Sequence, residues 1–398
     1  MAPTLTGGLG PGSRTGHCVA AIGNRIFSVG GYDGTQWLSD THVLVTHATV
    51  GEKRSVTAEW LYSTPSGDVP RPHAGAASCL IGSKMFIFGG RSASGKYLAD
   101  LHALDTVSNT WIKASFDGRN APSARAGHTI TNIGNRLFLH GGYDGTKRYN
   151  DSWIFDPREG TWYVAPIHGI SPLSIPPRSL HTTTDIGSKL FIYGGFDGKK
   201  DLSAPLWCDT SHWKWSHAFF HDMELPARSW HATIRCGTNF LVHGGHESSH
   251  GHVDSTLLVD GEGGTWQRLE AERVDVVSSS FLGSAPTSAA SLASRHGSLH
   301  KAMSGGPMTP TSPRGSPNAA ANAAASQRNS FSLSAALSFT SPSDAALPLQ
   351  SSAHAMATVP AAALGRDDVF AVVLGGWNGK KYHGTPRCLQ LMGTMVSY

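Results

Sequence analysis

The chain has 398 residues, a formal net charge of +4, 46 glycines and only 15% charged residues. Of its 28 acidic residues, 20 are Asp, which favours turns, and only 8 are Glu, which favours helices. These values argue against a helical protein, and the small net charge gives no reason to expect a nucleic acid partner. No stretch of 18 consecutive apolar residues is present, so we expect no membrane-spanning helix.

Neither the N-terminal segment nor the cysteines suggest secretion. Residues 1–12 contain no charged n-region and no apolar h-region, so we expect no signal peptide. The five cysteines are spread out and include no C-x-x-C pair: Cys18, Cys79, Cys208, Cys236 and Cys388. We therefore expect buried, reduced thiols in a cytoplasmic protein, with the nucleus as the alternative compartment.

In chain order, a di-glycine ends a short apolar run at six places. The six pairs are 30–31, 89–90, 141–142, 194–195, 244–245 and 375–376. The first five are spaced by 59, 52, 53 and 50 residues, and the last spacing is 131. Removing about 80 residues of unusual composition from that spacing restores a period near 50.

Other marks recur in register with the glycines. An Arg–His segment precedes the first apolar run of five units: RTGH (14–17), RPH (71–73), RAGH (125–128), RSLH (178–181) and RSWH (228–231). Asp-Gly or Asn-Gly turns follow four of the six di-glycines, and a Trp opens the last run of five units: Trp60, Trp111, Trp162, Trp215 and Trp266. The pattern therefore predicts four short strands joined by turns in each unit. The first unit carries an insertion of eight or nine residues.

A period near 50, four strands per unit and a Gly-Gly/Trp signature resemble the kelch repeat. The resemblance covers about 310 residues and implies an all-β fold, a six-bladed β-propeller with one blade per repeat. We expect an N-terminal tail at 1–13, blades 1–5 at 14–272, an insertion at 273–352 and blade 6 at 353–398. Each Trp should wedge between blades, and the histidine before each first strand should bond backbone within its own blade.

The outer strand of the last blade has two candidates. Residues 393–398 lie at the expected offset from the last di-glycine, and we favour them. Residues 3–8 are the alternative, because they would latch the N-terminus onto the same blade.

The 273–352 insertion is rich in Ser, Ala and Pro, so we expect residues from about 278 to 352 to be mostly disordered. It contains candidate kinase acceptor sites, and such matches also arise by chance in segments of this composition. The candidates are Ser298, Thr309, Ser312, Ser316 and Ser341. A phosphate there would add negative charge.

The loops after each di-glycine and the Arg–His segments should emerge on one face of the propeller. The candidate partner-binding side chains on that face are Arg91, Lys96, Lys147, Arg148, Lys199, Lys200, Lys380, Lys381, Trp230 and Trp377. Such a basic and aromatic rim suits an acidic peptide, a phosphopeptide or a free C-terminal carboxylate. The aspartates of the same loops, Asp33, Asp144 and Asp197, are explained as turn formers.

The repeated arginines form a second candidate set for the same face. They are Arg14, Arg71, Arg125, Arg178 and Arg228. Because these residues belong to the repeat signature itself, a framework role competes with partner binding, and we favour the framework role.

We expect no catalytic residues, no metal and no cofactor. The segment from His246 to His250 matches the zincin motif H-E-x-x-H, but it follows a di-glycine in a loop, whereas zinc chemistry needs both histidines on one helix face.

We therefore predict a non-enzymatic, monomeric interaction module, a scaffold or adaptor. The kelch resemblance also implies a ubiquitin-ligase substrate receptor as a narrower version, although no BTB or F-box segment is recognisable. The alternative is an enzyme at the channel mouth, because kelch enzymes such as epimerases and oxidases exist.

Overall fold

The computed structural model describes residues 6–7, 10–49, 55–221, 224–269, 277–278, 334–338, 355–359, 369–374 and 387–392, with side chains for most residues from 10 to 269. Within these ranges the fold is all-β, and the helical segments are two short 3-10 turns, Gly118–Asn120 and Pro172–Ser174. No helix among the described residues is long and apolar enough to cross a membrane.

Six sheets follow one another along the chain, and each contains four antiparallel strands that form one blade. β1 (Thr6–Gly7) and β27 (Val277–Ser278) extend the sheet of blade 1, and β6 (Ser66–Gly67) extends that of blade 2. Blade 1 consists of β2 (Cys18–Ile22), β3 (Arg25–Tyr32), β4 (Trp37–Thr49) and β5 (Ser55–Ser63). Blade 2 consists of β8 (Ala77–Ile81), β9 (Lys84–Phe88), β11 (Leu101–Asp105) and β12 (Thr110–Lys113). Blade 3 consists of β13 (Thr129–Ile133), β14 (Arg136–His140), β15 (Ser152–Asp156) and β16 (Thr161–Val164).

The second half of the propeller repeats this plan. Blade 4 consists of β17 (Thr182–Ile186), β18 (Lys189–Tyr193), β19 (Leu206–Asp209) and β20 (Lys214–His217). Blade 5 consists of β21 (Ala232–Cys236), β22 (Asn239–His243), β25 (Thr256–Asp260) and β26 (Thr265–Leu269). Blade 6 consists of β29 (Ala355–Val359), β30 (Val369–Leu374), β31 (Arg387–Met392) and β28 (Ser334–Ser338).

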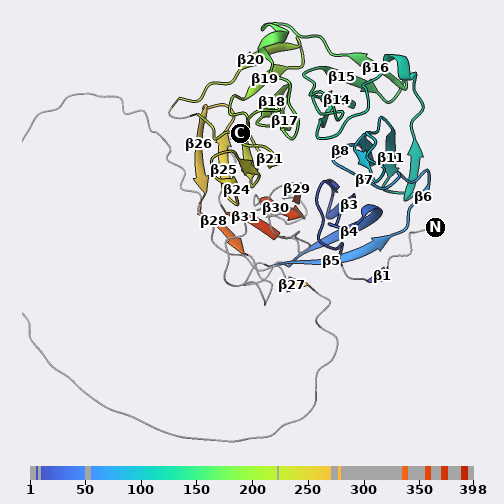
Figure 1. The fold of residues 1–398 in the computed structure, drawn as a ribbon. Helices are drawn as coiled ribbons and strands as arrows, with labels where there is room; N and C mark the ends of the chain where they lie inside the picture. The colour runs from blue at the N-terminus through green and yellow to red at the C-terminus, as the bar shows by residue number, and fades with distance from the viewer. Residues whose placement is uncertain are drawn as a thin grey trace, which may run out of the picture. The chain divides into compact units, whose positions relative to one another are not determined.

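The first strands of the blades form a closed inner ring. Each of β2, β8, β13, β17, β21 and β29 neighbours the next, and β29 neighbours β2 again. Figure 1 shows the sheets arranged around this ring. The six-bladed β-propeller predicted from the repeats is therefore confirmed.

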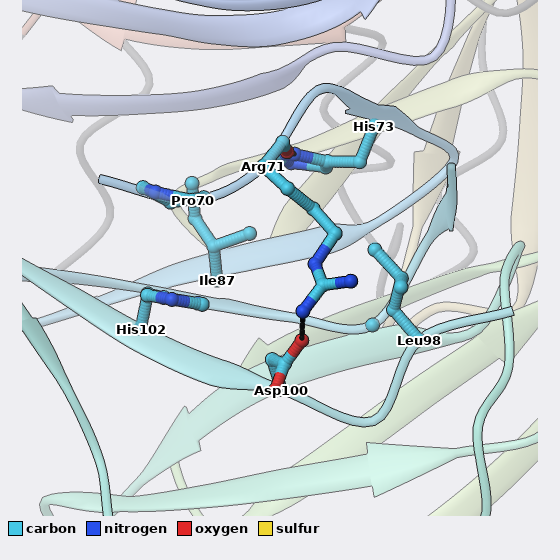
Figure 2. Close-up of a pocket in the computed structure, with 8 residues that line it drawn as sticks. Pro70, Arg71, His73, Ile87, Leu98, Asp100 and His102 are labelled. Carbon is cyan, nitrogen blue, oxygen red and sulfur yellow. Dashed lines mark hydrogen bonds and ion pairs between the residues drawn. The ribbon is translucent and has the colours of Figure 1, made fainter. Parts of the chain in front are cut away.

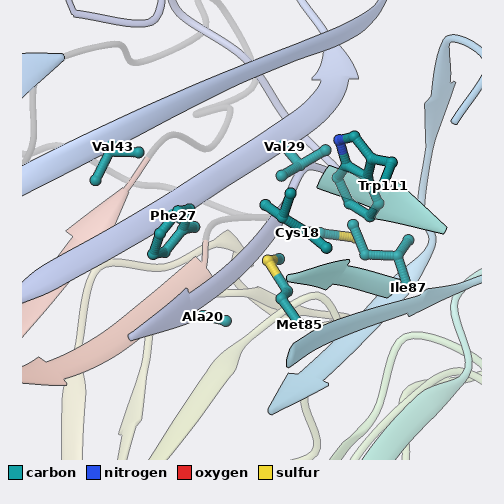
Figure 3. Packing of buried hydrophobic residues seen from close by; sticks show 9 residues of the cluster. Cys18, Ala20, Phe27, Val29, Val43, Met85, Ile87 and Trp111 are labelled. Atoms are coloured by element: carbon teal, nitrogen blue, oxygen red, sulfur yellow. The ribbon is translucent and has the colours of Figure 1, made fainter. Parts of the chain in front are cut away.

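The seams described between blades 1 and 5 are apolar, because the second strands of these five blades are buried on both faces. At the seam of blades 1 and 2, Trp111 packs with Cys18, Val29, Met85 and Ile87 in one cluster (Figure 3). Trp162 and Trp215 fill the next two seams in the same way. The predicted role of the Trp as an inter-blade wedge is confirmed for these blades.

Blade 6 closes differently from our prediction. Its outer strand is β28, drawn from the segment that we expected to be disordered, and it pairs antiparallel with β31. The N-terminal alternative is wrong, because β1 (Thr6–Gly7) pairs with β5 of blade 1. Residues 393–398, which we favoured, lie outside the described residues.

The predicted insertion in the first unit appears as long strands. β4 and β5 pair from Thr41↔Ser63 to Thr49↔Ser55, well beyond the length of the equivalent strands elsewhere. The outer edge of β5 is covered by β1 and by β27 (Val277–Ser278), which pairs parallel with it. Short flanking segments cover sheet edges, which otherwise offer unpaired backbone groups to other chains.

The described cysteines fit the predicted buried thiols. Cys18, Cys208 and Cys236 are buried and free, and Cys79 is partly buried and free. Burial raises the pKa of the thiols of Cys18, Cys208 and Cys236 to about 12, so they are poor nucleophiles. The side chain of Cys388 lies outside the described residues.

Candidate functional site

One end of the propeller collects the residues that the sequence analysis selected. In blades 1–5, the segment before the first strand forms an antiparallel β-bridge with the loop that follows the di-glycine of the same blade. The bridges are Thr15↔Tyr32, Ala74↔Arg91, Ala126↔Tyr143, Ser179↔Phe196 and Ser229↔His246. We call this end the loop face; it comprises residues 14–17, 32–37, 71–75, 91–97, 125–128, 143–149, 178–181, 196–201, 228–231 and 246–252.

The aspartates of the loop face are occupied by local turns. In the loop of blade 1, Asp33 Oδ1 accepts hydrogen bonds from the backbone amides of Thr35 (2.8 Å) and Gln36 (2.7 Å). These bonds, the Gln36 bond foremost, lower the pKa of Asp33 to about 2. Asp144 and Asp197 accept the same pair of bonds in blades 3 and 4. Their predicted role as turn formers is confirmed.

Among the cations of the loop face, Arg91 has a local partner, because its Nε donates to the Gly95 carbonyl at 3.3 Å. Five of these cations are exposed, and none forms an ion pair within the described part of the chain: Arg91, Lys96, Lys147, Lys199 and Lys200. The remaining candidates, Lys380, Lys381 and Trp377, lie outside the described residues. Residues 91–97, 143–149 and 196–201 together contain six cations and three acids, so these loops of blades 2–4 carry a net positive charge.

A ladder of cations and aromatic rings crosses this surface from blade 2 to blade 4. The Arg91 guanidinium lies 5.9 Å from the Tyr97 ring centre, and Tyr97 meets Tyr143 edge to face at 5.9 Å. The Arg148 guanidinium then lies 4.5 Å from the Tyr143 ring and 4.8 Å from the Phe196 ring. We call these five residues the cation–aromatic ladder; its rings hold Arg148 in a fixed orientation across a seam.

Arg148 has a polar neighbour at the next blade. Its Nε donates to the Ser179 hydroxyl oxygen at 3.1 Å, while its other nitrogens make no further hydrogen bond within the described residues. Lys147 lies 4.8 Å from the Tyr149 ring, whose hydroxyl donates to Asp144. A guanidinium that is positioned and still has donors free suits a carboxylate or phosphate ligand.

The channel mouth is edged by a chain of backbone hydrogen bonds from blade to blade. Gly75, Gly127, Leu180 and Trp230 each donate to the equivalent residue of the preceding blade, and the chain begins at the carbonyl of Gly16. All five residues have positive φ, which glycine tolerates but Leu180 (62°) and Trp230 (59°) do not favour. Trp230 remains 41% exposed there. Backbone strain of this kind clusters at functional sites.

The repeated arginines are mostly internal. Arg14, Arg125, Arg178 and Arg228 are buried, and in each case Nη1 donates to the carbonyl of the first glycine of the same blade. The backbone carbonyls of Arg125, Arg178 and Arg228 each accept from the second glycine of the preceding blade, as in Gly142 N to Arg178 O at 2.8 Å. This burial supports the framework role that we favoured.

The second unit departs from our alignment. By its pairing with the post-glycine loop, His73 occupies the position of the arginines and Ala76 that of the histidines. Arg71 lies outside that framework, exposed, with its guanidinium 3.5 Å from Asp100. A small hollow remains beside the shorter His73, between Arg71, Leu98 and Asp100 (Figure 2).

Two of the repeated histidines bond across the seam to the preceding blade. His231 Nε2 lies 2.9 Å from the Thr182 hydroxyl of blade 4, and His181 Nε2 lies 3.1 Å from that of Thr129 in blade 3. The prediction of backbone bonding within one blade is therefore wrong for these two. Burial lowers the pKa of His128 to about 3 and that of His181 well below its usual value, so both are neutral.

The H-E-x-x-H segment forms a hairpin, β23 (His246–Glu247) with β24 (Gly251–His252), which confirms the predicted loop. The carboxylate of Glu247 is buried against the guanidinium of Arg228. His246 Nδ1 lies 3.0 Å from Asp201 Oδ2. No group of three metal-ligating side chains occurs among the described residues.

Sequence reasoning missed the acids that pair with the buried arginines. Arg14 makes a two-bond ion pair with Asp40 (2.7 and 2.9 Å), and Arg125 does so with Asp151 (2.6 and 3.0 Å). Both aspartates stand nine residues after the second glycine of their unit. That shared spacing could have identified the two aspartates from the sequence. Burial alone would raise the pKa of Asp151, but the hydrogen bonds and the positive charge of Arg125 lower it below its usual value.

A ring of four-stranded blades, each with a di-glycine after its second strand, is typical of a kelch-type propeller. Comparison with known proteins also identifies kelch repeats in this chain. A family model described as the KLHDC2/KLHL20/DRC7 Kelch-repeats domain matches residues 53–175, and Kelch motif models match residues 13–46 and 177–217. The chain therefore carries kelch repeats, and they fold into a β-propeller.

Its relatives are larger proteins of several kinds. Host cell factor of Drosophila melanogaster is 32% identical over 234 residues, 52% of this chain and 14% of the relative. Acyl-CoA-binding domain-containing protein 6 of Oryza sativa subsp. japonica is 32% identical over 39% of this chain and 26% of the relative. Tip elongation aberrant protein 1 of Schizosaccharomyces pombe is 31% identical over 49% of this chain and 17% of the relative. The matched regions span at most 26% of these relatives.

Proposed function

We propose that this propeller is a non-enzymatic interaction module that binds an acidic or carboxylate-bearing peptide or protein through the loop face. The observation that carries the proposal is the charge imbalance in residues 91–97, 143–149 and 196–201, where six cations stand against three acids. The cations are Arg91, Lys96, Lys147, Arg148, Lys199 and Lys200, and the acids are Asp144, Asp197 and Asp201. The cation–aromatic ladder supplies the apolar surface beside those charges.

The geometry favours binding over catalysis. The histidines with strongly lowered pKa, His128, His140 and His181, are buried in the framework and bond to it, rather than converging at the channel mouth. Arg148 and Ser179 instead form a fixed, cationic contact point at a seam. We propose that a partner's carboxylate docks there, with its neighbouring side chains lying along the ladder toward Trp230.

The wider role follows from this mode of binding. A monomeric propeller that holds one peptide acts as a scaffold or adaptor, and a ubiquitin-ligase substrate receptor is one such adaptor. The buried free thiols suit a reducing compartment, so we propose a cytoplasmic or nuclear protein. The kinase acceptor candidates in the insertion lie outside the described residues and remain sequence predictions.

The test is peptide binding by the full chain. A panel of fluorescent ten-residue peptides would include acidic, neutral and basic members, each with a free and an amidated C-terminus. We expect retention of acidic or free-carboxylate members, and a loss of affinity of at least about tenfold in the Arg91→Glu/Arg148→Glu variant. Because Arg148 is packed, the exposed pair Lys96→Glu/Lys199→Glu is measured beside it.

The matched control reverses charge at the opposite end of the same blades. Lys84 and Lys189 are exposed in the β8–β9 and β17–β18 turns, so Lys84→Glu/Lys189→Glu changes net charge equally and leaves the loop face intact. Equal affinity in the loop-face and control variants would refute the proposal, as would a panel with no preference for acidic members.

A further inference from the structure

In blades 1–5, strand register defines one position opposite the first glycine of the pair, and in blades 1 and 3 the residue at this position bonds to the buried arginine. In blade 3, His140 pairs with Ser152, so Asp151 stands opposite the first glycine of the pair. The same reasoning places Asp40, Asp100 and Ser255 opposite the first glycine of blades 1, 2 and 5. In blades 1 and 3 the aspartate at this position neutralises the arginine of its own blade.

Blade 4 has the arginine without the acid. Ile192 pairs with Leu206, which places Ala204 opposite the first glycine. Blade 5 also lacks Asp at this position, but there Glu247 and the Ser255 hydroxyl bond to Arg228. No acid contacts Arg178 among the described residues.

Arg178 is consequently a buried and uncompensated cation. The side chain is 0% exposed, and its Nη1 donates to the Gly194 carbonyl at 3.1 Å. Its Nη2, the nitrogen that binds the aspartate in blades 1 and 3, has no hydrogen-bond partner. A buried charge left unpaired destabilises the folded state, and unsatisfied buried groups of this kind are rare in folded proteins.

The missing acid would sit at the surface. In blades 1 and 3 the arginines are 5% and 1% exposed, whereas their aspartates are 22% and 32% exposed. Ala204 is itself exposed. The position beside Ala204 can therefore be reached from solvent, with the Arg178 guanidinium behind it.

We propose that blade 4 carries a carboxylate-binding site, in which a carboxylate from outside the chain occupies the place of the absent aspartate and bonds to Arg178. The expected ligand is a small carboxylate or a carboxylate of a bound peptide, because that group completes the same pair in blades 1 and 3. This site is separate from the cation–aromatic ladder and does not depend on the proposed function.

The test uses thermal unfolding of the full chain in sodium acetate and in sodium chloride at equal ionic strength. We expect acetate to raise the wild-type midpoint by about 2 °C over chloride. Ala204→Asp supplies the carboxylate internally, so it should raise the midpoint in chloride and abolish the acetate-specific gain. Ala204→Asn, of the same size and uncharged, should keep part of the gain.

A reciprocal variant protects the test against a misfolded Ala204→Asp. Asp40→Ala recreates the vacancy in blade 1, and we expect acetate to restore part of its lost stability. An acetate gain that is equal in wild type and Ala204→Asp would be a general salt effect and would overturn the proposal. No gain in wild type would overturn it as well.

Capped tripeptides then identify the source of the carboxylate. Acetyl-Gly-Glu-Gly-amide offers a side-chain carboxylate, acetyl-Gly-Gly-Gly offers a terminal one, and acetyl-Gly-Gly-Gly-amide offers none. Stabilisation of wild type by either of the first two, but not by the third, supports a peptide ligand. Stabilisation by acetate alone supports a free small carboxylate, and stabilisation by the third contradicts the site.

Discussion

Arg125 and Arg148 illustrate two uses of the same residue type within one blade. Arg125 is buried, bonds to the Gly141 carbonyl and Asp151, and holds the start of the first strand against the end of the second. Arg148 lies at the surface between two rings, with donors free for a ligand. The neighbours, rather than the residue type, decide whether an arginine stabilises the fold or can bind a partner.

The buried histidines are the residues through which acid should weaken the propeller. His128 and His140 have pKa values of about 3, lowered first by burial, and that of His181 is also well below 6.5. In the unfolded chain these histidines take up protons near pH 6.5, whereas in the folded protein His128 and His140 stay neutral until about pH 3. Their contribution to the free energy of unfolding is therefore fully present above pH 6.5 and is lost as the pH falls toward 3. Each contributes at most about 1.4 kcal/mol per pH unit in that window.

We predict that the free energy of unfolding, measured with urea at constant ionic strength, falls between pH 7 and pH 5. His181→Gln should reduce that slope, because Gln offers a hydrogen-bonding group to Thr129 and does not titrate. An unchanged slope, together with NMR evidence that His181 protonates in the folded protein near pH 6, would contradict the prediction.

At the scale of elements, the di-glycine is where neighbouring blades touch. The first glycine has positive φ, and a Cβ built on Gly194 (φ +66°) would lie 2.2 Å from the Arg228 carbonyl oxygen. At the β17–β18 turn, Gly187 has a similar φ of +56° but nothing within 4 Å. The two positions share the conformational requirement and differ only in crowding.

We therefore predict that Gly194→Ala destabilises the propeller far more than Gly187→Ala. Gly187→Ala should cost about 1–2 kcal/mol, the price of a left-handed conformation. Gly194→Ala adds a clash between two backbones that cannot move independently, so we expect at least twice that loss. Urea denaturation of both variants is the measurement, and equal losses would show that the seam is not close-packed at this position.

Much of the fold could be predicted from the sequence because each structural requirement of a blade recurs in four to six of the repeats. The di-glycines, the Trp wedges and the Asp turns each meet a local demand of one blade, so they recur in register. The role of His73 could not be predicted from sequence. The segment RPH offers Arg71, two residues before His73, as an apparent match to the repeated arginine. The strand β28 could not be found either, since its sequence SAALS has no turn or spacing mark and its partner is distant along the chain.

For the whole molecule, the origin of the last outer strand decides how the ring closes. β29 lies between β21 and β2, so blade 6 links the last blade to the first. Within blade 6, β28 pairs with β31 from Ser334↔Met392 to Ser338↔Cys388. The propeller is therefore completed by a segment that lies on the N-terminal side of its own blade, beyond a long insertion.

Two variants separate this closure from the one that the sequence favours. Ala336→Pro places proline in the middle of β28, where it removes backbone pairing with Gln390. We expect faster hydrogen–deuterium exchange in residues 387–392 and a lower unfolding midpoint for the whole propeller, because β31 loses its outer neighbour. Deletion of residues 393–398 should leave both unchanged. The reverse outcome, protection lost on deletion and kept with the proline, would assign the outer strand to the C-terminal residues instead.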